Sequence, residues 1–158
     1  MASREIAGIY LFLARTSRQR AMIHTKCACT RVRRAARSLT DLYDDVLRPV
    51  GLKVTQFSVL RTIDRMGPVN ISALAAEMAL DRSTLGRNLG VLARQGLVVL
   101  SEGDDQRERT VTLTPRARRL LAKAVPLWEQ AQRRVDALLG RQGVATLFAL
   151  LGEFERLR

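Results

Sequence analysis

The sequence predicts a mainly α-helical (α+β) fold, a winged helix-turn-helix with N- and C-terminal dimerisation helices. Residues 81–114 read as a capped helix, a glycine stop and two β-prone runs joined by a charged loop. This is the order of a recognition helix followed by a β-hairpin wing. Long segments on both sides place apolar residues at three- and four-residue spacing, which is typical of helices. Aromatic residues make up only 4% of the chain, so the core must consist mainly of Leu, Val and Ala.

The first helix is expected over residues 25–48. Apolar side chains recur there at helical spacing as far as Leu47, and arginines occupy much of the remainder. Pro49 and Gly51 then end the pattern, because neither residue favours a continuing helix.

The residues before this helix contain a short apolar run, 6–14, which is too short to span a bilayer. Arginines follow the run and would oppose export as a signal peptide. We therefore expect residues 1–21 to be either a disordered arm or an extension upstream of a true start at Met22. Residues 22–158 are expected to form a single domain, and no membrane partner is expected.

The winged helix-turn-helix is expected over residues 55–113. Thr55 is a candidate N-cap for its first helix, because a threonine hydroxyl can accept an unpaired backbone N–H. A second, short helix over residues 72–78 leads through a tight turn to a third helix, for which Asp81 is the candidate N-cap. Two short helices joined by such a turn form a helix-turn-helix.

A long C-terminal helix region is expected over residues 115–157. Thr114 can cap it, and the proline that follows suits a first helical position. We expect Pro126 to kink this helix and Gly140 and Gly143 to bracket a break. The apolar stripe exceeds what a small winged helix can bury, so the sequence favours a symmetric homodimer.

Charge indicates the kind of partner. The chain has 27 Lys and Arg against 15 Asp and Glu, a formal net charge of +12, which favours a polyanion. On the predicted recognition helix, the face opposite the apolar residues carries side chains that can donate to phosphates or base edges. These candidates are Arg82, Ser83, Thr84, Arg87 and Asn88.

Metal and catalytic chemistry find little support. The chain has a single histidine, and the pattern His24-x-x-Cys27-x-Cys29 offers too few ligands for a zinc or copper site. No nucleophile motif, glycine-rich phosphate loop or paired acid and base appears. Two cysteines cannot form a disulfide framework, which favours a reducing cytoplasm. We expect no metal, no cofactor and no enzymatic activity.

From residue 27 to residue 154 the chain resembles the multiple-antibiotic-resistance-regulator (MarR) family of dimeric winged-helix repressors. The residues that carry the resemblance are Asp81-Arg82-Ser83-Thr84-Leu85, Asp105-Gln106-Arg107 and Leu113-Thr114. The resemblance implies that Arg107 enters the minor groove, with Arg109 as the competing residue and Asp105 orienting the arginine. It also implies that Ser83, Thr84 and Arg87 read the major groove.

The resemblance further implies a dimer built from the first and the last two helices, with a ligand pocket between dimer and DNA lobes. Because the family often binds aromatic acids, Tyr43, Phe57 and Trp128 are candidates to line that pocket. Core packing is the alternative for each, and it is favoured for Phe57.

Cys29 falls where organic-hydroperoxide-sensing members of the family keep their reactive cysteine. Tyr43 matches one of the two tyrosines those members place around it, and Arg33 stands at the position of the other. A cation one helical turn from the sulfur would favour the thiolate, the species that peroxides attack. The alternative is an inert cysteine buried in a dimer interface.

The sequence thus predicts a regulator that binds a pseudo-palindromic operator as a homodimer. It would act as a repressor released by a small molecule or an oxidant. Its expected partners are double-stranded DNA, a second copy of the chain, and a small aromatic ligand or a hydroperoxide. A non-specific, basic nucleic-acid-packaging or RNA-binding protein is the alternative, since its mechanism would need only the charge. A thiol peroxidase using Cys29 is the third class considered.

Overall fold

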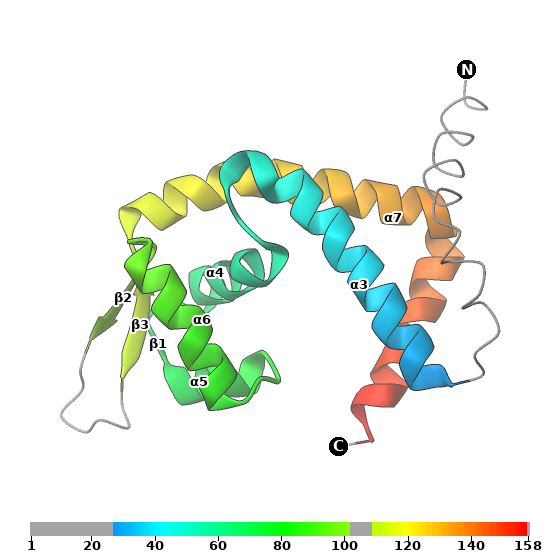
Figure 1. Cartoon of the computed structure of the whole chain (residues 1–158), viewed down its shortest axis with the longest axis horizontal. Helices are drawn as coiled ribbons and strands as arrows, with labels where there is room; N and C mark the ends of the chain where they lie inside the picture. The colour runs from blue at the N-terminus through cyan, green and yellow to red at the C-terminus, as the bar shows by residue number, and fades with distance from the viewer. Residues whose placement is uncertain (1–26, 102–108, 158) are drawn as a thin grey trace. The chain divides into compact units, whose positions relative to one another are not determined.

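The structure, a computed structural model, describes residues 27–101 and 109–157 (Figure 1). The chain divides into two compact units, residues 1–39 and 40–158. In the first unit, the described part is Cys27 and the N-terminal portion of helix α3 (Ala28–Leu47). All its described side chains are exposed except that of Arg34, which is half-buried.

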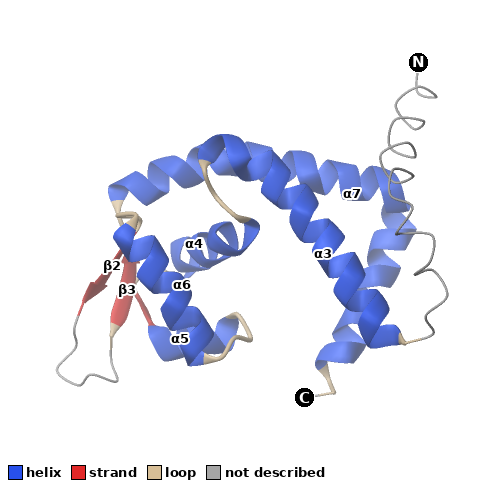
Figure 2. Cartoon of the chain, in the orientation of Figure 1, coloured by secondary structure: helices blue, strands red, loops and turns tan. Residues whose placement is uncertain are grey.

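The second unit contains the rest of α3 and a helix-turn-helix followed by a β-hairpin (Figure 2). Its elements are η1 (Arg48–Val50), α4 (Val54–Met66), β1 (Val69–Asn70), α5 (Ile71–Glu77), α6 (Arg82–Arg94), β2 (Val98–Ser101), β3 (Thr110–Leu113) and α7 (Pro115–Glu155). The three strands form an antiparallel sheet in the order β1-β3-β2, in which Val111 pairs with Val69 on one side and with Leu100 on the other. The predicted mainly helical fold with a small wing sheet is confirmed.

The core of this unit is aliphatic. Leu85, Leu89 and Leu92 of α6 are fully buried, at the three- and four-residue spacing that the sequence predicted for the inward face of this helix. Among residues 27–101 and 109–157, Phe57 is the one aromatic residue in the buried core. The buried leucines therefore determine which face of α6 is exposed to solvent.

Helix α4 begins two residues earlier than predicted, at Val54, with Lys53 and not Thr55 at the N-cap. Its cap comes from another helix. The Asp44 carboxylate of α3 accepts the Val54 N–H at 2.7 Å, and its second oxygen lies 3.1 Å from the Lys53 ammonium. The Gln56 side chain accepts the Lys53 N–H at 2.9 Å. Asp44 therefore satisfies the Val54 N–H from another helix, and Gln56 satisfies the Lys53 N–H locally.

Helix α7 breaks at Gly140, as expected, but the helical dihedral angles continue through Pro126. The kink expected at Pro126 stays a prediction, because helical dihedral angles do not decide whether the axis bends there. A proline removes one backbone hydrogen bond, and a helix can absorb its ring by a gentle bend. Gly140 has φ 67° and ψ 166°, a conformation that other residues rarely adopt. Gly143 stays within the helix.

Candidate nucleic-acid interface

Helix α6 is held at its N-terminus by the predicted cap residue. The Asp81 carboxylate accepts the Thr84 N–H at 2.8 Å, which confirms Asp81 as the N-cap. The same carboxylate accepts the hydroxyls of Ser83 at 2.6 Å and Thr84 at 2.7 Å. These hydrogen bonds, the one from Ser83 foremost, hold the pKa of Asp81 well below its usual range.

The Asp81 contacts extend to an arginine one turn further along α6. The Arg87 guanidinium donates to the Thr84 hydroxyl oxygen at 3.2 Å, while that hydroxyl donates to Asp81. The hydroxyl protons of Ser83 and Thr84 are thus already engaged within the chain. Thr84 is consequently better suited to positioning Arg87 than to donating to a base.

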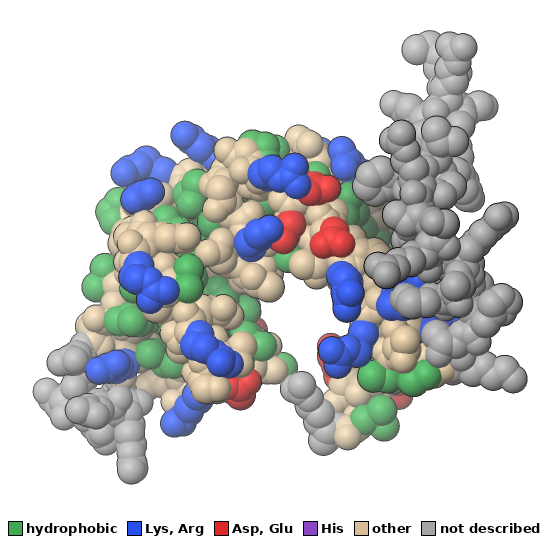
Figure 3. Space-filling model, viewed as in Figure 1, with side chains coloured by type: hydrophobic (Ala, Val, Ile, Leu, Met, Phe, Trp, Pro, Cys, Tyr) green, Lys and Arg blue, Asp and Glu red, His purple; other side chains and the backbone are tan. Residues whose placement is uncertain are grey.

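The outward face of α6 is basic and open to solvent. Arg82, Ser83 and Arg87 are exposed, and Asn88 is half-buried. Arg94 adds a further exposed cation in the last turn of the helix. Figure 3 shows Lys and Arg side chains, in blue, over the part of the second unit that contains α5 and α6. The five candidates from the sequence therefore lie on one helix, on or beside its solvent face: Arg82, Ser83, Thr84, Arg87 and Asn88.

Sequence reasoning missed Gly86 on this face. A Cβ added to this exposed glycine would meet no atom within 4 Å, so packing within the chain gives no reason for it. A glycine inside a helix costs roughly 0.5–1 kcal/mol relative to alanine. Its spacing from Gly90, four residues on, was visible in the sequence and was the available signal. Because Gly86 has no side chain, the wall of a DNA groove could approach the backbone of α6 closely at this position.

The wing candidates fall largely outside the described residues. Asp105 and Arg107 both lie in the segment 102–108, between β2 and β3, so the structure does not place them. Arg109 is exposed beside the start of β3, and its backbone carbonyl accepts the Ile71 N–H at 3.1 Å. Ser101 pairs with Thr110, which sets where the hairpin loop leaves the sheet.

Two of the three predicted effector residues contact each other, and the third, Tyr43, contacts the same helix, α7, that carries Trp128. Phe57 is buried and stacks on the half-buried Trp128, with ring centroids 6.0 Å apart and an interplanar angle of 24°. The Tyr43 hydroxyl donates to the Gln132 side-chain oxygen. Burial, with a smaller contribution from Asp136, raises the pKa of Tyr43, so the phenol remains a donor at neutral pH.

Cys29 is exposed in the first turn of α3. Cys27 is also exposed, and it precedes the first helical residue. Hydrogen bonds from Thr30, chiefly its side chain, lower the pKa of the Cys27 thiol. The described residues contain no cluster of three or more His, Cys, Asp or Glu side chains that could hold a metal ion.

Replacing Asp81 tests the cap and its contacts. Asp81→Ala should lower the melting temperature and weaken DNA binding, because Thr84 loses its acceptor and Arg87 its fixed neighbour. Asp81→Asn retains a cap acceptor and should melt closer to the wild type. The folded-state pKa of Asp81 lies below its unfolded value of about 3.9. Its stabilisation is therefore complete above that pH and is lost as the pH falls through the folded value.

Thermal unfolding at pH 7 and under acid conditions measures both effects. If Asp81→Ala melts like the wild type at pH 7 while α6 remains helical, the cap contributes nothing to stability.

Comparison with known proteins places these features in one family. A model of the MarR family matches residues 50–108, the segment from the end of η1 to the connection between β2 and β3. The Mycobacterium tuberculosis transcriptional regulator MosR, solved in complex with DNA, is 44% identical in sequence, with a TM-score of 0.74. The alignment covers 84% of this chain and 98% of MosR.

Two further proteins are similar at lower identity. The transcriptional repressor CouR, solved with p-coumaroyl-CoA, is 26% identical with a TM-score of 0.75, covering 83% of this chain and 93% of CouR. The uncharacterized HTH-type transcriptional regulator YwoH of Bacillus subtilis is 29% identical over 86 residues, which is 54% of this chain. Those residues span 63% of the length of YwoH.

Proposed function

Because the chain belongs to the MarR family and is a DNA-binding transcriptional regulator, we propose that it represses transcription by binding a pseudo-palindromic operator as a homodimer. The observation that carries this proposal is the solvent face of α6, where Arg82, Ser83 and Arg87 lie opposite a fully buried leucine stripe. A helix held in this way presents its outward side chains to the major groove. Arg107 is assigned to the minor groove, with Asp105 orienting it and Arg109 as the competing wing residue.

The second half of α7 supports the homodimer. Among described residues, none after Ala131 is buried. Large apolar side chains are exposed along this stretch: Leu138, Leu139, Phe148, Leu150, Phe154 and Leu157. An apolar surface of this extent is usually covered by a partner, and a second copy presents the same surface.

The length and hydropathy of α7 also meet the criterion for a membrane-crossing helix. The break at Gly140 opposes that reading, because unpaired backbone groups in the middle of a lipid-exposed span are costly. We therefore assign the apolar surface to subunit contact and place the regulator in the cytoplasm.

Release of the operator is proposed to follow binding of a small aromatic ligand or oxidation of Cys29. CouR is a repressor solved with an aromatic thioester, p-coumaroyl-CoA. In this chain Tyr43 and Trp128 are half-buried and accessible to such a ligand, whereas Phe57 is buried against Trp128. Cys29 is exposed in the described chain, so a hydroperoxide can reach its sulfur.

Operator selection followed by two arginine variants tests the proposed function. Arg87→Ala should relax base preference at one position in each half-site, at a cost of about 1–3 kcal/mol. Arg107→Ala should weaken binding while the dimer stays folded, because the lost contact is local and electrostatic. Binding is measured by fluorescence anisotropy with an operator selected from a random pool.

Arg118→Ala is the matched control, since this exposed arginine lies on α7 and not on α6 or in the wing. Unchanged affinity in both test variants would contradict the DNA assignments. The packaging alternative predicts a steep salt dependence with little preference between duplexes, whereas a regulator prefers its site by roughly 4–10 kcal/mol.

A further inference from the structure

Asp81 orients the two hydroxyls at the N-terminal turn of α6. One oxygen of its carboxylate accepts the Ser83 hydroxyl at 2.6 Å, and the other accepts the Thr84 hydroxyl at 2.7 Å. Because these hydrogen bonds lower the pKa of Asp81, the carboxylate is ionised at neutral pH and can only accept. The single proton of each hydroxyl is therefore donated to Asp81 and is not available to a bound molecule.

The two hydroxyls differ in how far their oxygens are engaged as acceptors. The Thr84 oxygen already accepts from the Arg87 guanidinium at 3.2 Å. For the exposed Ser83, no donor to its oxygen is found among residues 27–101 and 109–157. A hydroxyl has one donor proton and two acceptor lone pairs. Ser83 consequently presents to solvent an oxygen that can accept a hydrogen bond but not donate one.

The polarity of this hydroxyl decides which DNA groups it can contact. In the major groove, the donors are the amino groups at N6 of adenine and N4 of cytosine, whereas N7 of the purines, O6 of guanine and O4 of thymine are acceptors. Phosphate oxygens are acceptors as well. An oxygen that can only accept therefore forms a hydrogen bond with an amino group, and not with a keto oxygen or a phosphate. The N-terminal residues of a recognition helix are those that reach base edges.

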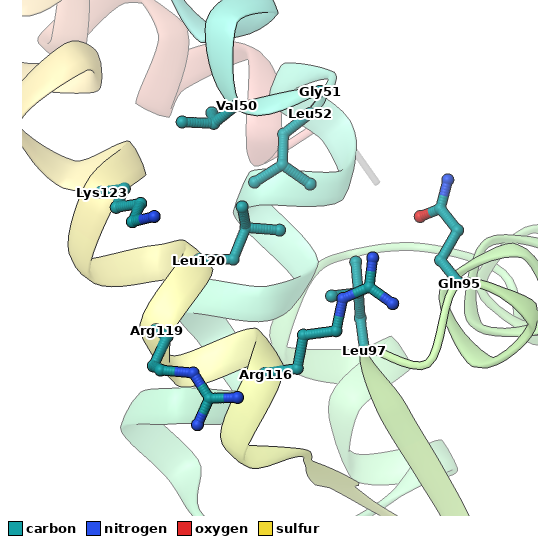
Figure 4. Close-up of a pocket in the computed structure, with 9 residues that line it drawn as sticks. All are labelled: Val50, Gly51, Leu52, Gln95, Leu97, Arg116, Arg119, Leu120 and Lys123. Carbon is teal, nitrogen blue, oxygen red and sulfur yellow. The ribbon is translucent and has the colours of Figure 1, made fainter.

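At its other end, α6 lies beside a cavity of about 430 Å³ (Figure 4). Gln95 and Leu97 contribute to its lining, as do three cations of α7: Arg116, Arg119 and Lys123. Helix α6 has 13 residues, so the cavity lies roughly 20 Å along the helix from Asp81. These cations are therefore too distant to form hydrogen bonds with Asp81 or Ser83. Among the described residues, Asp81 sets the polarity of the Ser83 hydroxyl.

We propose that Asp81 is a specificity-determining residue of the operator contact, because it restricts Ser83 to accepting from the amino group of an adenine or a cytosine. The proposal rests on the proposed function, in which α6 occupies the major groove. Asp81 is a positioning residue here, since it acts through Ser83. Arg87 has the opposite polarity, because a guanidinium can only donate. The first turns of α6 thus present one acceptor and one donor, four residues apart.

Operators with single altered bases test the role of Ser83. Selection from a random pool by the wild type and by Ser83→Ala locates the base pair at which Ser83→Ala loses preference. The amino group of that pair is then removed, by 2-aminopurine in place of adenine or by 2-pyrimidinone in place of cytosine. We expect the wild type to bind this operator roughly 2- to 10-fold more weakly, since one hydrogen bond is lost. Ser83→Ala should bind both operators alike. A 7-deazapurine in the same pair, which removes an acceptor, should affect the wild type and Ser83→Ala equally.

An operator with this base pair inverted in both half-sites tests the role of Asp81. Inversion places a keto oxygen where the amino group stood, so the wild type should bind the inverted operator more weakly. Asp81→Gly frees the Ser83 proton for that oxygen and should bring the ratio of the two affinities close to one. Glycine costs only a few tenths of a kcal/mol at an N-cap, so α6 should remain helical. Asp81→Asn retains an oxygen that accepts from Ser83 and should keep the wild-type ratio.

Equal wild-type affinity for the parent operator and the operator without the amino group would overturn the proposal. An Asp81→Gly variant that keeps the wild-type ratio would do the same. The altered-base measurement involves no Asp81 variant, so it decides the proposal even if Asp81→Gly folds poorly. Relaxed base preference in Arg87→Ala with no change in Ser83→Ala overturns this proposal alone. If neither variant changes the selected sequence, the assignment of α6 to the major groove fails, and this proposal fails with it.

Discussion

Placing glutamates at Leu150 and Phe154 should convert the protein into a monomer and weaken operator binding by roughly 10²–10⁴-fold, the usual gain from linking two binding events. The two side chains are four residues apart on α7 and are exposed to 55% and 45%. Since neither is buried within the chain, the substitutions should leave the monomer folded. Each monomer would then reach only one half-site.

Sedimentation velocity at micromolar concentration measures the assembly, and anisotropy measures operator binding. Ala145→Glu/Ala149→Glu is the matched control, because these exposed residues are also four apart and lie about 180° and 140° around α7 from Phe154. The control should remain dimeric. A wild-type protein that sediments as a monomer would contradict the homodimer, as would a Leu150→Glu/Phe154→Glu variant that stays dimeric.

The parts of the fold that the sequence predicted well are those with local signals. Asp81 and Thr114 cap their helices by accepting backbone N–H groups three residues on, so sequence spacing alone identifies them. The start of α4 could not be found in this way. Its cap acceptor, Asp44, lies ten residues before the N–H that it accepts, on a different helix.

Proline and glycine in α7 illustrate a second limit. Both residues disfavour a continuing helix, and sequence reasoning expected Pro126 to bend it and Gly140 to interrupt it. Only Gly140 leaves the helical region, because a glycine adopts a positive φ without steric penalty. Whether a helix leaves the helical conformation at a proline or at a glycine depends on the packing around each residue. The spacing of residues in the sequence does not encode that packing.

In the candidate site, too, some features follow from local sequence signals and others depend on the folded structure. The residues on α6 could be predicted because a buried leucine stripe defines the opposite face. The engagement of the Ser83 and Thr84 hydroxyls with Asp81 could not, since it depends on rotamers. The cavity lined by Val50, Leu97 and Leu120 could not be predicted either, because these residues come from three distant segments of the chain.

If Cys29 is the oxidant sensor, a stoichiometric organic hydroperoxide should abolish operator binding, and dithiothreitol should restore it. The Cys29 thiolate would take one oxygen from the hydroperoxide, giving a sulfenate and an alcohol. Two dithiothreitol thiols would then reduce the sulfenate to the thiol, with release of water and a cyclic disulfide. The exposure of Cys29 on α3 makes its sulfur accessible to both reagents.

The pair Cys27→Ser and Cys29→Ser decides between the two thiols. The proposal expects Cys29→Ser to stay bound under peroxide and Cys27→Ser to respond like the wild type. Thr30 lowers the pKa of the Cys27 thiol, which makes Cys27 a demanding control because it is exposed as well and its thiolate is favoured. Operator anisotropy is followed during the peroxide titration, and intact-mass spectrometry detects the added oxygen. Release of Cys29→Ser by peroxide, or failure of peroxide to release the wild type, would show that Cys29 is not the sensor.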